Sequence, residues 1–364
     1  MEFIPAQYYY DVYLVIATIL CFSCFSFYNS RNEQLSLGVK ADAEKAFGVF
    51  LFFSVFIGIR PISSVFADMT QYVGIYNNYG TIYTFDWDVE NLIYDNQMNW
   101  FASIRLNPVI YYIYIALIYY GGMYVACKKM FPGNAYAVFL VCLVAFSTFG
   151  AATNGIKAGS AASLFLVALA YRNNLKVCIP IAILSLGFHH SMQLPIGALL
   201  ITLIYNKKPK YYIYFWILCF VISAAHITYF QNLFAGFTDD KGASYLISDR
   251  SEDIIYDRGG FRLDFILYSS MPILMGWYAV SKKKIQDKLY STILSTYTIV
   301  NAIWMLCIYA SFTNRIAYLS WFMYPIVLVY PLFLEQWGPS RYKTFAKVAG
   351  LHLAFTLFMH IVYY

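Results

Sequence analysis

The residues of this chain that could do chemistry are ionisable side chains placed at the ends of apolar stretches. Lysine or arginine there could bind a phosphate, and a carboxylate or a histidine could accept a proton. Such candidates occur at five places, and they are Arg60 with Asp68 and Tyr72, Lys157, His189 with His190, Arg262 with Asp264, and Arg315. Ionisable groups at membrane depth are costly and mostly functional. Together they would form an anion site with a proton acceptor, although each one alone also fits a structural role or a lipid headgroup contact.

The composition predicts that these residues belong to a membrane protein. The chain has 364 residues, of which 60% are hydrophobic and only 12% are charged, whereas ordinary soluble chains are about 25% charged. Apolar runs of about 20 residues with almost no charge are typical of membrane-spanning helices. We therefore predict an all-α polytopic integral membrane protein, with about 10–12 transmembrane helices in a single domain over residues 1–364. Some runs, notably 46–59 and those within 159–205, are shorter than a full span.

The positive-inside rule predicts the orientation of these helices. Of the 25 lysines and arginines, 17 lie in alternate loops, at 31–45, 128–129, 172–176, 207–210, 282–288 and 341–347. This side is then cytoplasmic, and the two longer loops, at about 60–107 and 229–262, are extracytoplasmic. Most basic residues on the outer side are arginines, whose planar fork suits phosphate and carboxylate. We expect short helices in both loops, including an amphipathic one over Val89–Ile104.

The first of these loops is rich in Asp, Asn and aromatic residues. Aromatic faces beside Asp and Asn are what sugars bind, but the same residues are typical of an interfacial aromatic belt. Composition does not separate the two interpretations. The candidate sugar-binding residues are Tyr72, Trp87 and Trp100 from this loop, together with His190.

The sequence lacks the motifs that are typical of several other classes of function. It contains no H-E-x-x-H zinc motif and no G-x-x-x-x-G-K-[ST] phosphate loop, and Asp86-Trp87-Asp88 lies on the outer side, away from nucleotide sugars. The seven cysteines lie in or beside apolar runs, which argues against a disulfide framework or a CxxC metal site. The net charge of +6 reflects lysines clustered beside spans, so we expect no nucleic acid as a partner. We predict neither a metal site nor a cofactor.

Four short motifs resemble those of one membrane-protein family. They are Gly58-Ile59-Arg60-Pro61-Ile62-Ser63-Ser64-Val65-Phe66-Ala67-Asp68, Phe188-His189-His190-Ser191, Gly260-Phe261-Arg262-Leu263-Asp264-Phe265 with Tyr268-Ser269-Ser270-Met271-Pro272-Ile273, and Asn314-Arg315-Ile316-Ala317-Tyr318. In this order they resemble the EpsG family of Wzy-type polymerases of O-antigen, capsule or exopolysaccharide, in the form found in Bacteroides-like bacteria. The likeness extends over residues 47–332. Two positions depart from the pattern, since Lys157 stands where Arg is usual and Ala67 where Gly is common. Lysine can neutralise a phosphate but does not bind it as a fork.

The resemblance implies a glycosyltransferase without metal or cofactor in the bacterial inner membrane, with its active site facing the periplasm. It would transfer a growing glycan from undecaprenyl pyrophosphate onto a lipid-linked repeat unit. The pyrophosphate-binding cations would be Arg60, Arg262, Arg315 and Lys157. Asp68 is the preferred proton acceptor, His189 is the second choice, and Asp264 would orient Arg262. Its partners would be the undecaprenyl-pyrophosphate-linked oligosaccharide and the lipid bilayer, with a flippase and a chain-length regulator as further candidates.

Two alternatives stay open. One is a flippase or exporter of lipid-linked oligosaccharide, which would use the same residues as headgroup sites. A transporter more often shows internal repeats, broken helices at the midplane and ionisable groups deep within spans, whereas the charged groups here lie at one edge. The other is an O-antigen-ligase-type transferase with the same donor and a different acceptor, lipid A or protein, which the sequence does not separate from a polymerase.

Overall fold

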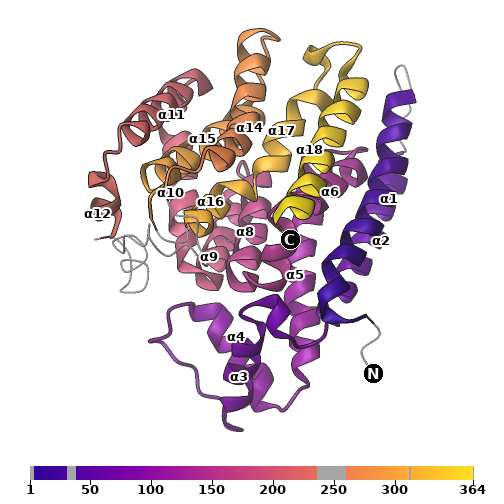
Figure 1. Ribbon diagram of the computed structural model, residues 1–364, viewed down its shortest axis with the longest axis vertical. Helices are drawn as coiled ribbons and strands as arrows, with labels where there is room; N and C mark the ends of the chain where they lie inside the picture. The colour runs from indigo at the N-terminus through magenta and orange to yellow at the C-terminus, as the bar shows by residue number, and fades with distance from the viewer. Residues whose placement is uncertain (1–3, 31–37, 236–259, 311–312, 364) are drawn as a thin grey trace. The chain divides into compact units, whose positions relative to one another are not determined.

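The computed structural model describes residues 4–30, 38–235, 260–310 and 313–363. Within these ranges the chain forms helices joined by turns, with no β-strand (Figure 1), so the predicted all-α architecture is confirmed. The chain divides into two compact units, of which the first comprises Met1–Gln193 with Leu332–Tyr364 and the second comprises Leu194–Pro331. The prediction of a single membrane domain stays a prediction.

The helices of the two units follow the apolar runs of the sequence. In the first unit they are α1 (Tyr9–Ser30), α2 (Val39–Gly58), α3 (Met69–Asn78), α4 (Leu92–Ser103), α5 (Pro108–Met130), α6 (Ala135–Leu143), α7 (Thr148–Thr153), α8 (Ile156–Ala170), α9 (Leu175–Phe188) and α18 (Arg341–Tyr363). In the second they are α10 (Gln193–Tyr205), α11 (Pro209–Ala224), α12 (Tyr229–Ala235), α14 (Leu263–Ser281), α15 (Lys288–Leu306), α16 (Thr313–Trp321) and α17 (Tyr324–Val329). Short 3-10 turns are η1 (Ala6–Tyr8), η2 (Ser64–Phe66), η3 (His190–Met192), η4 (Tyr330–Phe333) and η5 (Glu335–Trp337).

Several of these helices can cross a membrane, which confirms the polytopic membrane protein. Those that are long and apolar enough among the described residues are Ala6–Ser30, Pro108–Met130, Leu263–Ser281, Lys288–Leu306 and Arg341–Val362. Thr313–Trp321 and Tyr324–Phe333, which bend by 44° at a short break, form a sixth if counted together. The other predicted spans fall on α2, which has charged residues in its first turns, on the nine-residue α6, where a span over 134–149 was predicted, and on the shorter apolar helices α8 to α11. A 14-residue helix such as α9 is about 21 Å long, less than the ~30 Å hydrocarbon core.

The two long loops carry short helices, as predicted. The first contains η2, α3 and α4, and α4 falls within the stretch predicted to form an amphipathic helix. Figure 1 shows α3 and α4 together at one end of the first unit, next to the ends of α5 and α9. Of the second loop, α12 is described, and residues 236–259 lie outside the described part of the chain.

Close helix packing in the first unit depends on small residues. α5 packs against both α2 and α8. At Gly122 of α5, an added Cβ would meet the Ser163 carbonyl oxygen of α8 at 2.8 Å, and at Gly58 of α2 it would meet the Ile113 Cα of α5 at 2.6 Å. Small residues let helix backbones approach closely inside a membrane, where lipid provides no hydrophobic force between helices. The two glycines therefore set the spacing of α2, α5 and α8.

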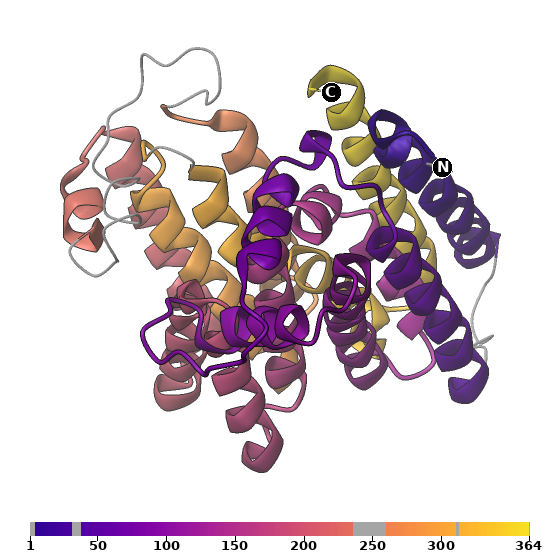
Figure 2. The same cartoon turned by 90° about the horizontal axis from the view of Figure 1, so that it is seen from below.

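Acidic side chains join helices that are distant in the sequence. The buried Asp42 carboxylate of α2 accepts hydrogen bonds from the Ala135 amide (2.6 Å) and the Tyr136 amide (3.2 Å) at the start of α6. A helix N-terminus has unpaired N–H groups and a dipole that favours an anion. Near the chain termini, Asp11 Oδ1 of α1 lies 2.6 Å from His360 Nε2 of α18, and Figure 2 shows these two helices next to each other.

Hydrogen bonds between buried side chains hold the second unit together. Trp321 Nε1 of α16 donates to Ser269 Oγ of α14 at 2.7 Å, and Asn301 Nδ2 of α15 donates to Ser320 Oγ of α16 at 3.0 Å. Burying such groups costs free energy unless they are hydrogen-bonded. These bonds fix α14, which begins directly after Arg262, against α15 and α16.

We expect Gly122→Ala to lower the unfolding temperature of the purified protein in detergent, because the new methyl group meets the Ser163 backbone. Overpacking of this kind costs about 1–3 kcal/mol. Gly48→Ala in α2 is the matched control, since no atom lies within 4 Å of its Cβ position, and it should be neutral or slightly stabilising. Equal unfolding midpoints for the two variants would contradict the close approach of α5 to α8.

Candidate functional site

Arg60 lies where two helices of the first unit end. Its side chain is 2% exposed, with Nη1 donating to the Ile57 carbonyl (2.9 Å) at the end of α2 and Nη2 to the Thr153 carbonyl (3.0 Å) at the end of α7. The last carbonyls of a helix lack partners within it and attract a cation. Burial lowers the pKa of Arg60 to about 10, so the guanidinium stays charged at neutral pH. These bonds favour a structural role for Arg60, and direct contact with a pyrophosphate stays a prediction.

Asp68 begins α3 and is tied to the junction of α7 and α8. Its backbone amide donates to Asn154 Oδ1 at 3.2 Å, and its half-buried carboxylate does not cap α3. The preceding residue, Ala67, has φ of 46°, a conformation that glycine adopts without the steric cost that a Cβ brings. This explains why glycine suits that position, and Ala67 carries the strain in its place.

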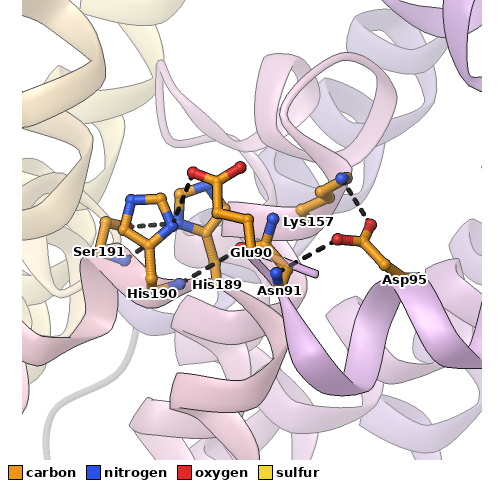
Figure 3. A network of polar contacts seen from close by, with 7 residues as sticks. All are labelled: Glu90, Asn91, Asp95, Lys157, His189, His190 and Ser191. Carbon is orange, nitrogen blue, oxygen red and sulfur yellow. Dashed lines mark hydrogen bonds and ion pairs between the residues drawn. The ribbon is translucent and has the colours of Figure 1, made fainter. Parts of the chain in front are cut away.

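Lys157 forms an ion pair with a residue that sequence reasoning did not single out. Its Nζ lies 2.7 Å from Asp95 Oδ1 of α4, and the two side chains are 21% and 15% exposed (Figure 3). The ammonium also lies 5.0 Å from the ring centroid of Tyr94 and 5.9 Å from that of Tyr72, close enough for cation–π attraction. The loop helix α4 is therefore held at the first turn of α8.

A chain of polar contacts continues from Asp95 to the turn after α9. The Asn91 amide donates to Asp95 Oδ2 at 3.2 Å, and the His190 amide donates to Asn91 Oδ1 at 3.3 Å. His190 Nδ1 lies 3.1 Å from Glu90 Oε1. Figure 3 shows these side chains converging from α4 and its approach, from α8 and from the α9–η3 turn. We call Glu90, Asn91, Asp95, Lys157, His189, His190 and Ser191 the loop network.

His189 occupies the turn itself and caps η3 with its ring. His189 Nδ1 accepts a hydrogen bond from the Ser191 amide at 3.2 Å and lies 2.7 Å from Ser191 Oγ. The imidazoles of His189 and His190 stack, with centroids 4.8 Å apart and planes at 25°. The turn is thereby held on one side to the start of α4, through His190, and on the other side to η3, through His189.

The predicted sugar-binding residues are only partly brought together. His190 is itself part of the loop network, and the Tyr72 ring lies 5.9 Å from Lys157 Nζ of that network. Trp87 is 76% exposed, and its ring lies against Phe85, with 4.6 Å between centroids, while Trp100 lies against Phe101 at 5.2 Å.

The remaining predicted residues belong to the second unit. Arg262 and Asp264 form a two-point ion pair, with Nε to Oδ1 at 2.9 Å and Nη2 to Oδ2 at 2.6 Å, the fork geometry that Arg offers a carboxylate. The guanidinium also lies 3.7 Å from the Phe265 ring centroid. Arg315 is exposed on α16. That these three residues share one cavity with those of the first unit stays a prediction.

Asp95, Asn91, Glu90 and Asn154 are the site residues that the sequence interpretation missed. The available signal was the four-residue spacing of Asn91 and Asp95 on the predicted amphipathic helix, which places both on one face. With many acidic residues in the loop, no pattern showed which one would meet Lys157.

We expect Asp95→Asn to destabilise the protein by about 1–3 kcal/mol, because it leaves a mostly buried ammonium without its anion. Adding Lys157→Gln should recover part of the loss, since the double change removes both charges. The control is Asp88→Asn, whose side chain is exposed. Thermal unfolding in detergent measures these three variants and Lys157→Gln alone, and strictly additive effects of the two single changes would contradict a direct ion pair.

Comparison with known proteins identifies the family of the chain. No curated protein and no solved structure matches the chain. The model of the EpsG family matches residues 45–364. The match therefore includes the end of α2, the loop network, and Arg262 and Arg315 of the second unit. Since it covers most of the chain, the protein belongs to the EpsG family.

Proposed function

We propose that the protein is a polysaccharide polymerase that transfers a growing glycan from undecaprenyl pyrophosphate onto a lipid-linked repeat unit at the outer face of the inner membrane. The observation that carries the proposal is the family match over residues 45–364. Family membership supports a polymerase-like role in general. The donor, the acceptor and the outer-face location belong to the proposal.

The reaction would be a single displacement. A hydroxyl oxygen of the acceptor attacks the anomeric carbon, and the bond from that carbon to the pyrophosphate oxygen breaks. The lipid pyrophosphate leaves with the electron pair, and the hydroxyl proton passes to a carboxylate, for which Asp68 is our candidate. Charge growing on the leaving group requires fixed cations in a poorly hydrated site. Since pyrophosphate is a good leaving group, the proposed mechanism needs no general acid and no metal.

The described contacts support a division of labour among the cations. Arg60 is bound to backbone carbonyls in a buried position, so it would act by holding the ends of α2 and α7 and by its charge. Lys157, Arg262 and Arg315 would meet the pyrophosphate. Lys157 and Arg262 are each oriented by a carboxylate, Asp95 and Asp264.

A transporter of lipid-linked oligosaccharide is the second candidate, and one observation favours it. The pair Thr313–Trp321 and Tyr324–Phe333 is bent by 44° at a break of a few residues, and broken helices are typical of transporter binding sites. Arg315 lies on the first half of this pair. Polymerisation by purified protein separates the two functions, because a transporter forms no glycosidic bond.

We expect the purified protein, supplied with a lipid-pyrophosphate-linked repeat unit, to make a ladder of longer glycans. Asp68→Asn should reduce the ladder by about 10²–10⁴-fold, because it removes the proton acceptor and keeps the shape. Asp88→Asn, in the same loop, should polymerise normally. Gel or mass-spectrometric analysis of released glycans measures the products. If the folded native protein moves the lipid across vesicle membranes but makes no ladder, the transporter is correct.

The proposed periplasmic side of the loop network can be tested by cysteine labelling. All seven native cysteines are buried, so the background should be low. With a membrane-impermeant maleimide on intact spheroplasts, Ile82→Cys, which is 79% exposed, should react, and Lys207→Cys should react only after lysis. The reverse pattern would place the loop in the cytoplasm and overturn the outer-face reaction.

A further inference from the structure

The neighbours of the His189 ring determine which of its two nitrogens carries the proton. A backbone amide can only donate a hydrogen bond, and the Ser191 amide points at His189 Nδ1 from 3.2 Å. Nδ1 must therefore present its lone pair. A neutral imidazole carries one proton, which is then on Nε2. The Ser191 hydroxyl, 2.7 Å from the same nitrogen, can rotate to donate as well and so adds to the same preference.

Gaining a second proton would disrupt this arrangement. The new proton would go to Nδ1, facing the Ser191 amide hydrogen, and the cap of η3 would be lost. A general base needs a lone pair that can take a proton without such a cost. In its capping geometry the ring offers an N–H group at Nε2, so it is suited to donate a hydrogen bond.

The ring is also held in one orientation from its other side. It stacks on His190 at 4.8 Å, whose amide is bound by Asn91 and whose Nδ1 faces Glu90. His190 and Glu90 are thus two titratable groups that the described contacts place near this ring. A donor fixed before substrate arrives costs no reorganisation during the reaction, which is what makes such donors effective.

We propose that His189 is held as the Nε2–H tautomer and donates a hydrogen bond from Nε2 to a substrate oxygen, and that it does not accept the proton of the acceptor hydroxyl. This assignment rests on the proposed polymerase function. The substrate oxygen that accepts this hydrogen bond belongs either to the pyrophosphate or to a sugar hydroxyl. His189 is therefore a group that binds substrate, and a different residue, the carboxylate of Asp68 in the proposed mechanism, takes the proton.

Two substitutions test the roles of the two ring nitrogens separately. His189→Asn places an amide oxygen near the position of Nδ1, so it keeps the cap of η3, for which Asn is a favoured residue, and removes the Nε2 donor. His189→Gln places an amide N–H₂ near the position of Nε2 and gives up the cap. We expect His189→Asn to fold normally and lose about 100-fold in polymerisation rate, the effect of removing one preorganised donor. His189→Gln should keep a rate within about tenfold of the native protein, despite lower thermal stability.

The tautomer itself can be measured without activity. The chain has five histidines, so ¹⁵N-histidine labelling and comparison with His189→Asn assign the two nitrogen signals of His189. We expect the protonated signal at Nε2 and the unprotonated one at Nδ1. A proton on Nδ1, full activity of His189→Asn, or loss in His189→Gln equal to that in His189→Asn would each overturn the proposal.

Competition with inorganic pyrophosphate identifies the oxygen. A larger inhibition constant for pyrophosphate in His189→Asn than in the native protein assigns the contact to phosphate. An unchanged inhibition constant with a raised KM for the acceptor substrate assigns it to the sugar. If the native protein makes no ladder at all, the proposed function fails, whereas the ¹⁵N signals still report whether the tautomer is the one inferred.

Discussion

The ion pair of Lys157 with Asp95 is the contact on which the first long loop depends. Both charges are largely withdrawn from water, where an unpaired charge would be expensive, so each requires the other. The pair joins residues 62 positions apart in the chain and holds α4 against the start of α8. Once α4 is placed, Asn91 reaches the His190 amide and Tyr94 lies beside the ammonium. The ion pair of Lys157 with Asp95 therefore also helps to position the turn that contains His189 and His190.

Three of the candidate cations of this protein are bound by groups of the protein itself. Arg60 is bound by carbonyls at two helix ends, and Lys157 and Arg262 are bound by carboxylates. A site of paired cations binds an anion less tightly in the ground state than an array of unpaired ones. An enzyme gains rate only from contacts that strengthen in the transition state, and a polymerase must release lipid pyrophosphate after every transfer. Paired cations would suit both requirements, which is compatible with the proposed function.

Much of the architecture was predictable because it depends on quantities that add up along the chain. Low charge and long apolar runs require a membrane, and this predicted the all-α polytopic protein. The loop between α2 and α5 and its amphipathic helix could be recognised from the change in composition. The family could be recognised from four ordered motifs. The helices shorter than a full span were visible in advance as short apolar runs at 46–59 and within 159–205.

The partners of the site residues could not be predicted in the same way, because they depend on distances between parts of the chain that are far apart in sequence. Residue type and position alone identified Arg60, Lys157 and His189 as candidates. Tertiary structure decided that Arg60 serves two helix ends, that Asp95 and not another acid of its loop meets Lys157, and that the Ser191 amide gives His189 its tautomer. A hydrogen bond depends on tenths of an ångström and on direction. Such geometry arises only when the helices that carry the two groups have packed.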